Sequence, residues 1–167
     1  GLVPPVFPNL NECVAYEHKD GSLVLNIRGS DKGRRAISIS SDQGKTWSNP
    51  ALDDALPCPS CQASVLRLSE NELLFSNPAT AFCGSIDTDS RKNMSLALSF
   101  DEGATWPVRR VLNPGQSGYS DLAVLKDGSI CCVFECGEVF YNKKISFARF
   151  TRDWLIQEPD NRQAVGR

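Results

Sequence analysis

The chain has 167 residues, enough for one domain with a hydrophobic core. Its 18 basic and 20 acidic side chains are spread along the sequence and give a formal net charge of −2, so there is no basic run of the kind that grips nucleic acid or anionic lipid. No apolar stretch has the length of a transmembrane helix, and Gly1 does not begin a secretory signal. We therefore expect a soluble domain with no nucleic-acid partner and no membrane-spanning segment, any targeting segment being removed or outside the chain.

Strand signals dominate the sequence. After a proline-rich start at residues 3–8, which does not suit a central strand, short runs of Val, Ile, Leu and Phe alternate with Asp-Gly, Asn and Pro turns. Strands are predicted at residues 36–40, 65–68, 73–76, 94–100, 122–125, 130–134 and 145–150. No long amphipathic helix is expected, and the polar stretch 157–167 is predicted to be a frayed tail. The fold class is all-β.

An internal repeat organises these strands. Residues 12–29, 62–79 and 119–136 each contain a strand, a tight turn and a second strand. The repeat places three residues nine positions ahead of their turns: Glu12 before Gly21, Gln62 before Asn71, and Tyr119 before Gly128. The turns are 50 and 57 residues apart, which is the size of a four-stranded propeller blade. The sequence therefore predicts about three blades, the last of them one strand short.

A second repeat lies between these segments. Residues 40–47 (SSDQGKTW) and 99–106 (SFDEGATW) both fit Ser-x-Asp-x-Gly-x-Thr-Trp and begin 59 residues apart. We interpret each as a hairpin turn in which Asp42 or Asp101 accepts backbone N–H groups and the glycine takes a positive φ. Trp47 and Trp106 are predicted to pack beneath the turns as core residues. These aspartates are interpreted as structural, neither catalytic nor calcium-binding.

The seven cysteines are an odd number, so they cannot all pair within the chain. Cys58 and Cys61 have the spacing of a zinc or redox pair, but no second pair with finger-like spacing follows, and His18 is the single histidine. Buried thiols, with one disulfide as an open alternative, are favoured over a zinc site. The sequence predicts no metal and no cofactor, and it leaves the redox compartment open.

The two octapeptides resemble the Asp-box of sialidases, which form six-bladed β-propellers. Further segments resemble that family in the same order along residues 9–150. Residues 11–13 (NEC) with 25–28 (LNIR) are similar to the segment that carries the catalytic glutamate and one arginine of an arginine triad. Residues 90–95 (SRKNMS) are similar to the segment of another triad arginine, and residues 118–122 (GYSDL) with 125–129 (LKDGS) to that of the nucleophilic tyrosine. Residues 61–64 (CQAS) and 75–78 (FSNP) also resemble family segments.

The resemblance implies a six-bladed sialidase-type β-propeller, of which residues 1–156 supply about three blades as its C-terminal part. It implies an exo-α-sialidase that releases terminal sialic acid from sialylated glycans or glycoconjugates. The family's first triad arginine and its acid/base aspartate have no counterpart in the chain. They are expected in the N-terminal half of the same propeller, which would be the chain's partner.

The resemblance assigns a role to five residues. Sialic acid carries a carboxylate on its anomeric carbon, so a neutral phenol suits as nucleophile better than a carboxylate, and sialidases are the tyrosine exception among glycosidases. Tyr119 is the implied nucleophile, and Glu12 is the base that activates it. Arg28 and Arg91 are implied to bind the substrate carboxylate through their planar forks of donors. Gln62 either lines the substrate site or satisfies backbone groups at a strand start.

Other interpretations of the same residues stay open. Without the resemblance, Tyr119 would be an ordinary strand tyrosine, Glu12 a solvated carboxylate, and the two arginines surface charges. A trans-sialidase would use the same residues as a hydrolase. A non-catalytic propeller that binds sialylated glycans or acts as a scaffold would be marked by loss of the Glu–Tyr pair, and the presence of both residues favours an enzyme.

Overall fold

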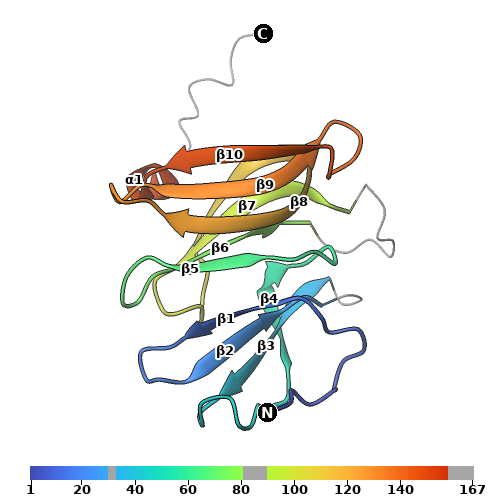
Figure 1. Cartoon of the computed structure of the whole chain (residues 1–167), viewed down its shortest axis with the longest axis vertical. Helices are drawn as coiled ribbons and strands as arrows, with labels where there is room; N and C mark the ends of the chain where they lie inside the picture. Colours follow the sequence, from blue (N-terminus) through green and yellow to red (C-terminus); the bar gives the residue numbers. More distant parts are fainter. Residues whose placement is uncertain (30–32, 81–89, 158–167) are drawn as a thin grey trace.

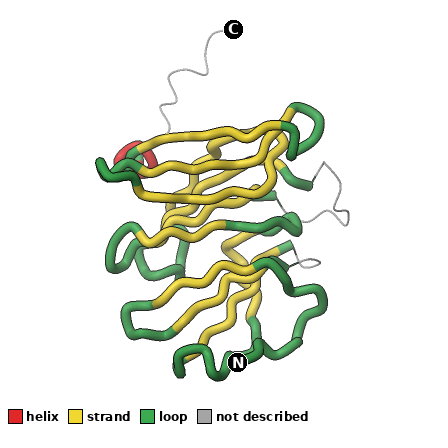
Figure 2. Tube along the Cα trace, viewed as in Figure 1, coloured by secondary structure: helices red, strands yellow, loops and turns green. Residues whose placement is uncertain are grey.

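A computed structural model describes residues 1–29, 33–80 and 90–157 of the chain. The described elements are, in chain order, β1 (Cys13–Glu17), β2 (Leu23–Ile27), β3 (Arg34–Ser40), β4 (Ala51–Pro57), β5 (Ser64–Arg67), β6 (Leu73–Pro78), β7 (Lys92–Ser99), β8 (Val108–Val124), β9 (Ile130–Gly137), β10 (Lys144–Phe150) and α1 (Arg152–Ile156). The fold is all-β, as predicted (Figures 1 and 2). The predicted tail begins at residue 157, and residues 158–167 lie outside the described residues.

The strands form two antiparallel sheets, ordered β1-β2-β3-β4 and β10-β9-β8-β7-β6-β5. The second sheet is continuous because β8 pairs with β7 through its first part and with β9 through its second part. Gln116 lies where the two parts meet, opposite Lys92 on one side and Gly137 on the other. The structure thus contains three blade-like units: β1–β4, then β5–β7 with the first part of β8, then the second part of β8 with β9 and β10.

The predicted blade repeat therefore corresponds to three units, although the second and third share a strand. The shared strand passes through Pro114 and Gly115, two residue types that are common in turns. Proline fits an extended backbone where its missing N–H is not needed by a neighbouring strand. The register of β8 shifts against both neighbours, between Met94 and Ser95 on β7 and between Ser117 and Ser120 on β8 itself. These irregularities let one strand serve two units.

The first strands of the three units lie next to one another: β1 contacts β5, and β5 contacts β8. β1 and β5 run in the same direction and begin on the same side of the molecule (Figure 1). Residues that precede or begin these strands are therefore brought together. This arrangement explains why the nine-residue offset in the repeat matters for the site.

Two hydrophobic clusters join the units. One lies between the first and second units and includes Leu56, Phe75 and Trp106. The other lies between the second and third and includes Leu74 and Phe134. β6 is buried along its whole length, and the side chains of Leu73, Leu74 and Phe75 at its start point alternately into the two clusters. This burial on both faces accounts for the unbroken apolar run at its start.

The two Asp-box turns have the predicted geometry. The Thr46 N–H donates to Asp42 Oδ1 at 2.8 Å, and Thr105 N–H donates to Asp101 Oδ1 at 2.8 Å. The glycines of both turns have positive φ, +82° at position 44 and +93° at position 103. Trp106 is buried in the cluster between the first two units, as predicted.

The prediction that Trp47 is a core residue is wrong. Trp47 is only half-buried and belongs to neither cluster. Trp106 belongs to the second unit and packs toward the first, so the equivalent Trp47 would face a unit preceding the first. No such unit is among the described residues.

The third unit leaves one face uncovered. On β10, Phe150 packs into the core, whereas Ile145 and Phe147 are 71% and 61% exposed. Across the ladder Phe147 lies opposite Val133 of β9, which is also exposed. Among the residues that the structure describes, β10 ends the sheet order, so the third unit has three described strands, one fewer than the first. The corresponding faces of the first two units are covered by the next unit along the chain.

Candidate active site

Glu12, Arg28 and Tyr119 meet at the side of the molecule where the first strands begin. The Tyr119 hydroxyl donates a hydrogen bond to Glu12 Oε1. Arg28 Nη1 donates to Glu12 Oε2 at 2.6 Å and lies 3.4 Å from the Tyr119 hydroxyl. The backbone also joins Glu12 to Arg28, whose N–H donates to the Glu12 carbonyl at 2.9 Å. The two residues thus face each other at the open end of the β1–β2 hairpin.

Arg91 reaches the same place from the start of β7. It is 6% exposed, and its Nη2 donates to the carbonyl of Ser60 at 2.7 Å. Its guanidinium carbon lies 5.6 Å from the ring centre of Tyr119 and 4.5 Å from that of Tyr141. Arg91 therefore approaches the face of the Tyr119 ring, while Arg28 approaches its hydroxyl.

The backbone around Tyr119 is fixed by two further side chains. Glu135 Oε2 accepts from the Tyr119 N–H at 3.0 Å, and Gln62 Oε1 accepts from the Ser120 N–H at 3.0 Å. Gln62 also donates through Nε2 to the Ala63 carbonyl at 2.8 Å. These are the backbone contacts that the sequence offered as one alternative for Gln62. Gln62 also lines a surface hollow of about 470 Å³ together with Tyr119 and Glu135.

The hydrogen-bonded pair has a defined protonation pattern. Burial raises the pKa of Glu12, but the hydrogen bonds from Tyr119 and Arg28 and the charges of Arg28 and Arg91 outweigh it, leaving this pKa below its ordinary value. Burial and the adjacent Glu12 carboxylate raise the pKa of Tyr119, against the opposite effect of the two arginines. At neutral pH the pair is therefore a carboxylate accepting from a neutral phenol.

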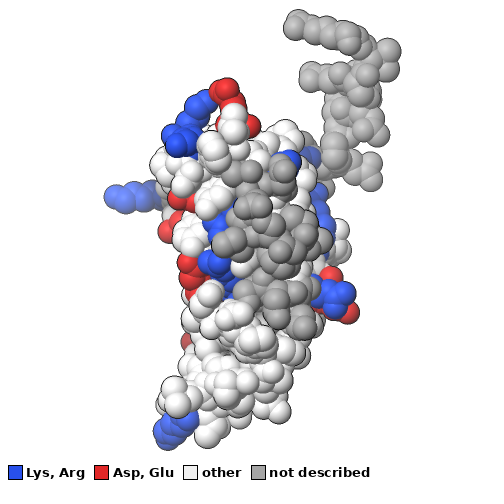
Figure 3. All heavy atoms as spheres, turned by 90° about the vertical axis from the view of Figure 1, so that its right-hand side faces the viewer, with Lys and Arg blue, Asp and Glu red and all other residues white. Residues whose placement is uncertain are grey.

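The side of the molecule that holds this cluster carries both basic and acidic side chains (Figure 3). Figure 3 shows the right-hand side of Figure 1, where β1 and β5 begin. Basic and acidic atoms lie side by side near its middle, whereas the lower part of this face is mostly uncharged (Figure 3). Such a mixed cluster of cations and a carboxylate suits a ligand with its own negative charge.

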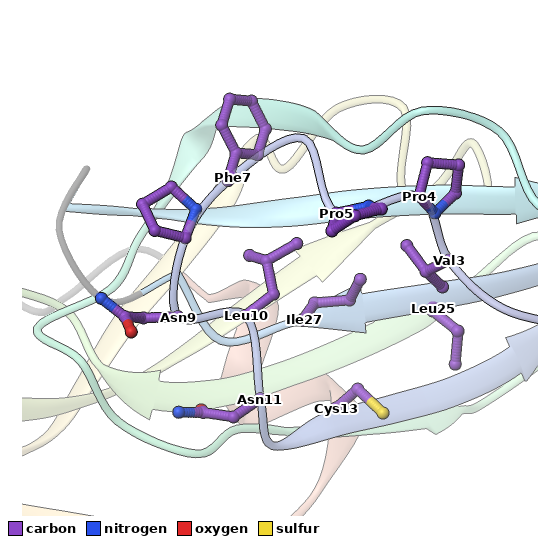
Figure 4. Close-up of a pocket in the computed structure, with 11 residues that line it drawn as sticks. Val3, Pro4, Pro5, Phe7, Asn9, Leu10, Asn11, Cys13, Leu25 and Ile27 are labelled. Atoms are coloured by element: carbon purple, nitrogen blue, oxygen red, sulfur yellow. The ribbon is translucent and has the colours of Figure 1, made fainter.

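A second cavity lies away from this cluster and has a different character. It measures about 440 Å³ and is enclosed between the proline-rich start of the chain and the outer face of β1 and β2 (Figure 4). Leu10, Leu25 and Ile27 line it with Val3, Phe7 and the three prolines. Its lining contains no Asp, Glu, His, Lys or Arg, and its polar side chains are Asn9, Asn11 and Cys13.

The cysteines form no metal centre in the described part of the chain. Cys58 and Cys61 are fully buried, and burial raises the pKa of Cys61 to about 12, so its thiol stays protonated. The six described cysteines are free, so none of them forms the disulfide left open above, and Cys83 lies outside the described residues. Nowhere in residues 1–29, 33–80 and 90–157 do three His, Cys, Asp or Glu side chains gather as metal ligands. Within the same ranges no helix is long and apolar enough to span a membrane.

The structure thus brings together all five residues singled out from the sequence: Glu12, Arg28, Gln62, Arg91 and Tyr119. Two residues of the cluster were missed. Ser60 was overlooked because its motif indicated metal or redox chemistry, and Tyr141 lies in the β9–β10 loop, where no repeat or family segment marks it.

The chain is similar to a known family model and to several known proteins. The model of the BNR repeat-like domain matches residues 6–132. A sialidase of Micromonospora viridifaciens is 33% identical over 156 residues, 87% of this chain and 22% of that protein. Sialidase-3 of Rattus norvegicus is 29% identical over 189 residues, 89% of this chain and 45% of that protein. The structure of the Hadza microbial sialidase Hz136 is 29% identical with a TM-score of 0.72, covering 89% of this chain and 29% of that one.

The two Asp-box turns and the three units are features of a β-propeller, and the solved sialidase propeller superposes on them. The chain belongs to the sialidase family. It spans less than half the length of the relatives named above.

Proposed function

We propose that the chain supplies part of the active site of a retaining exo-α-sialidase, with Tyr119 as nucleophile and Glu12 as the base that activates it. The observation that carries this proposal is the hydrogen bond from the Tyr119 hydroxyl to the Glu12 carboxylate. A phenol with an ordinary pKa of about 10 needs such a base to act at neutral pH. Tyr119 Oη would bond to the anomeric carbon as its proton passes to Glu12 and the glycosidic bond breaks, the leaving oxygen taking a proton from the acid/base aspartate proposed for the N-terminal half. Water would then displace Tyr119 from the anomeric carbon and release sialic acid.

Arg28 and Arg91 are proposed to bind the substrate carboxylate. Both guanidinium groups lie beside Tyr119, and each is fixed there by hydrogen bonds to the protein. A guanidinium stays charged at any working pH and offers two parallel donors to a carboxylate. The carboxylate on the anomeric carbon would thereby direct that carbon toward the Tyr119 hydroxyl.

Substrate binding would also strengthen the base. In the free protein the positive charges of Arg28 and Arg91 help to keep the pKa of Glu12 low. A bound carboxylate offsets part of those charges, so the pKa of Glu12 should rise toward its ordinary value. Glu12 would then accept the Tyr119 proton more readily when substrate is present than when it is absent.

The proposed enzyme needs residues that this chain does not contain. We propose that residues 1–156 form about three blades at the C-terminal part of the propeller and that its N-terminal half supplies the remaining triad arginine and the acid/base aspartate. The uncovered apolar face around Ile145 and Phe147 supports this, because the equivalent faces of the first two units are covered by a following unit. This chain alone should therefore be inactive.

Gln62 is proposed to line the substrate site while it holds the Ser120 backbone. Trans-sialylation would use the same groups, with a sugar hydroxyl in place of water. A non-catalytic glycan-binding or scaffold role would leave the Tyr119–Glu12 bond without a purpose.

The test is hydrolysis of a fluorogenic α-sialoside by the complete protein and by its Tyr119→Phe variant, which loses only a hydroxyl. We expect release of the fluorophore by the wild type and loss of most turnover in the variant. Tyr16→Phe is the matched control, since Tyr16 is a partly buried tyrosine that packs against the first hydrophobic cluster. No hydrolysis by the complete wild type, or near-wild-type rates for Tyr119→Phe, would reject the proposal.

A further inference from the structure

Ser60 contacts both arginines of the candidate site. Its hydroxyl accepts from Arg28 Nη2 at 3.2 Å, and its backbone carbonyl accepts from Arg91 Nη2 at 2.7 Å. Arg28 ends the β1–β2 hairpin of the first unit, whereas Arg91 precedes β7 of the second. Ser60 is therefore a bridge between two cations that come from different units.

Hydrogen bonds to buried groups of the first unit fix the loop that carries Ser60. Arg35 is completely buried, and its Nη1 donates to the Cys61 carbonyl at 2.9 Å and lies 3.7 Å from Cys58 Sγ. The Cys58 N–H donates to the Gly33 carbonyl at 2.9 Å. Both ends of the Cys-x-x-Cys segment are thus tied to the first unit. The motif that suggested a zinc or redox pair instead fixes a loop.

Ser60 itself adopts an unusual backbone conformation. Its φ is +55°, in the left-handed region that non-glycine residues rarely occupy, and it is 1% exposed. Such a conformation persists where surrounding contacts enforce it and is concentrated at functional sites. Here it allows the side-chain hydroxyl and the backbone carbonyl of one residue to contact two different guanidinium groups.

We propose that Ser60 is a positioning residue that sets the spacing and orientation of Arg28 and Arg91, and so shapes the subsite for the substrate carboxylate. This inference rests on the proposed function of the two arginines. Arg28 Nε and Arg91 Nε are buried and have no hydrogen-bond partner among the described residues, whereas the terminal nitrogens of both guanidinium groups bond to Ser60. A bidentate carboxylate contact loses strength when a guanidinium rotates out of plane.

The two contacts can be separated by substitution. Ser60→Ala removes the hydroxyl bound to Arg28 and leaves the carbonyl bound to Arg91. Ser60→Gly removes the same hydroxyl and also frees the backbone from its strained φ, which loosens the carbonyl. Ser38→Ala is the matched control, because Ser38 is a fully buried serine of the same unit whose hydroxyl bonds to the Ser48 carbonyl at 2.8 Å.

The experiment measures KM and kcat for a fluorogenic α-sialoside on the complete protein, together with crystal structures of the two Ser60 variants. We expect Ser60→Ala to raise KM about tenfold to a hundredfold, the effect of losing one hydrogen bond to a charged group, with a smaller change in kcat. Ser60→Gly should raise KM further, and Ser38→Ala should leave KM unchanged. The crystal structure of Ser60→Ala should show Arg28 displaced and Arg91 still on the carbonyl of residue 60.

The structural readout separates this inference from the proposed function. If the wild type does not hydrolyse sialosides, the proposed function fails, yet displacement of Arg28 in Ser60→Ala still establishes the positioning role. An unmoved Arg28 overturns the inference whatever the activity. An unchanged KM in both Ser60 variants of an active enzyme overturns it as well.

Discussion

The hydroxyl of Tyr119 donates a hydrogen bond to Glu12, although 107 residues separate them along the chain. The contact exists because Glu12 precedes β1 and Tyr119 lies in β8, where the first and third units begin their first strands. Arg28 touches both members of the pair.

Glu12→Gln should lower kcat about 10²–10⁴-fold, because it removes the proposed general base while preserving size. It should also lower the pKa of Tyr119, since the Glu12 carboxylate helps to raise that pKa in the wild type. Kinetics and a spectroscopic titration of the tyrosines on the complete protein measure the two effects. Glu17→Gln, at an exposed position of β1, is the control. An unchanged tyrosine titration in Glu12→Gln would contradict the described coupling.

Arg28→Lys and Arg91→Lys should each raise KM by about tenfold or more and lower kcat, since lysine keeps the charge but loses the fork of donors. Steady-state kinetics on the complete protein provide the measurement. Arg34→Lys serves for comparison, because Arg34 is half-exposed and pairs only with exposed Asp54 among the described ion pairs. Equal kinetic effects in all three variants would argue against a carboxylate subsite at Arg28 and Arg91.

The ring of Tyr141, and not its hydroxyl, should contribute to substrate binding. Its ring faces the Arg91 guanidinium at 4.5 Å, a cation–π contact worth about 0.5–2 kcal/mol. Tyr141→Leu should therefore raise KM about twofold to thirtyfold, whereas Tyr141→Phe should behave like the wild type. Kinetics of the two variants side by side decide between ring and hydroxyl. A defect of similar size in both would show that stacking on Arg91 is not the contribution.

The Asp-box carboxylates should contribute to stability in a pH-dependent manner. The hydrogen bond from the Thr105 side chain, with backbone and Ser99 contacts, lowers the pKa of Asp101 below its ordinary value of 3.8. A lowered folded-state pKa means that the carboxylate stabilises the fold above pH 3.8 and loses this effect as the pH falls through the folded value.

Asp101→Asn should accordingly lower the melting temperature at pH 7, and its difference from the wild type should shrink below pH 3.8. Thermal unfolding of both proteins across this pH range provides the data. Asp54→Asn, an exposed carboxylate outside the turns, should show a smaller difference at pH 7. A deficit for Asp101→Asn that stays constant down to the lowest pH would refute the assigned role of the charge.

The repeat in the sequence predicted the fold where strands were apolar and failed where they were not. β4 was missed because Asp53, Asp54 and Pro57 interrupt its apolar pattern. The start of β8 was missed because Pro114 and Gly115 indicate a turn, and only contacts with β7 and β9 keep that segment extended. α1 has five residues, too few for a helical period to be seen, and forms because Leu155 enters the core.

The sequence likewise predicted some residues of the candidate site and missed others. Glu12 and Tyr119 occupy equivalent repeat positions, so spacing alone brings them to the same place once a propeller is assumed. Ser60 acts through a backbone carbonyl and a left-handed φ, and Tyr141 through a ring face presented by a loop. Neither contact leaves a periodic signal in a single sequence.

The proposed mechanism requires Tyr119 to become covalently bonded to the sugar. It is tested most directly by incubating the complete protein with a fluorosialosyl fluoride, whose ring fluorine slows the oxocarbenium-like steps so that the covalent intermediate accumulates. Proteolysis and mass spectrometry should then locate one fluorosialyl group on the peptide that contains Tyr119, with no such adduct in Tyr119→Phe. An adduct on another residue would contradict the role of Tyr119 as nucleophile. So would inhibition of an otherwise active protein by this reagent without formation of any adduct.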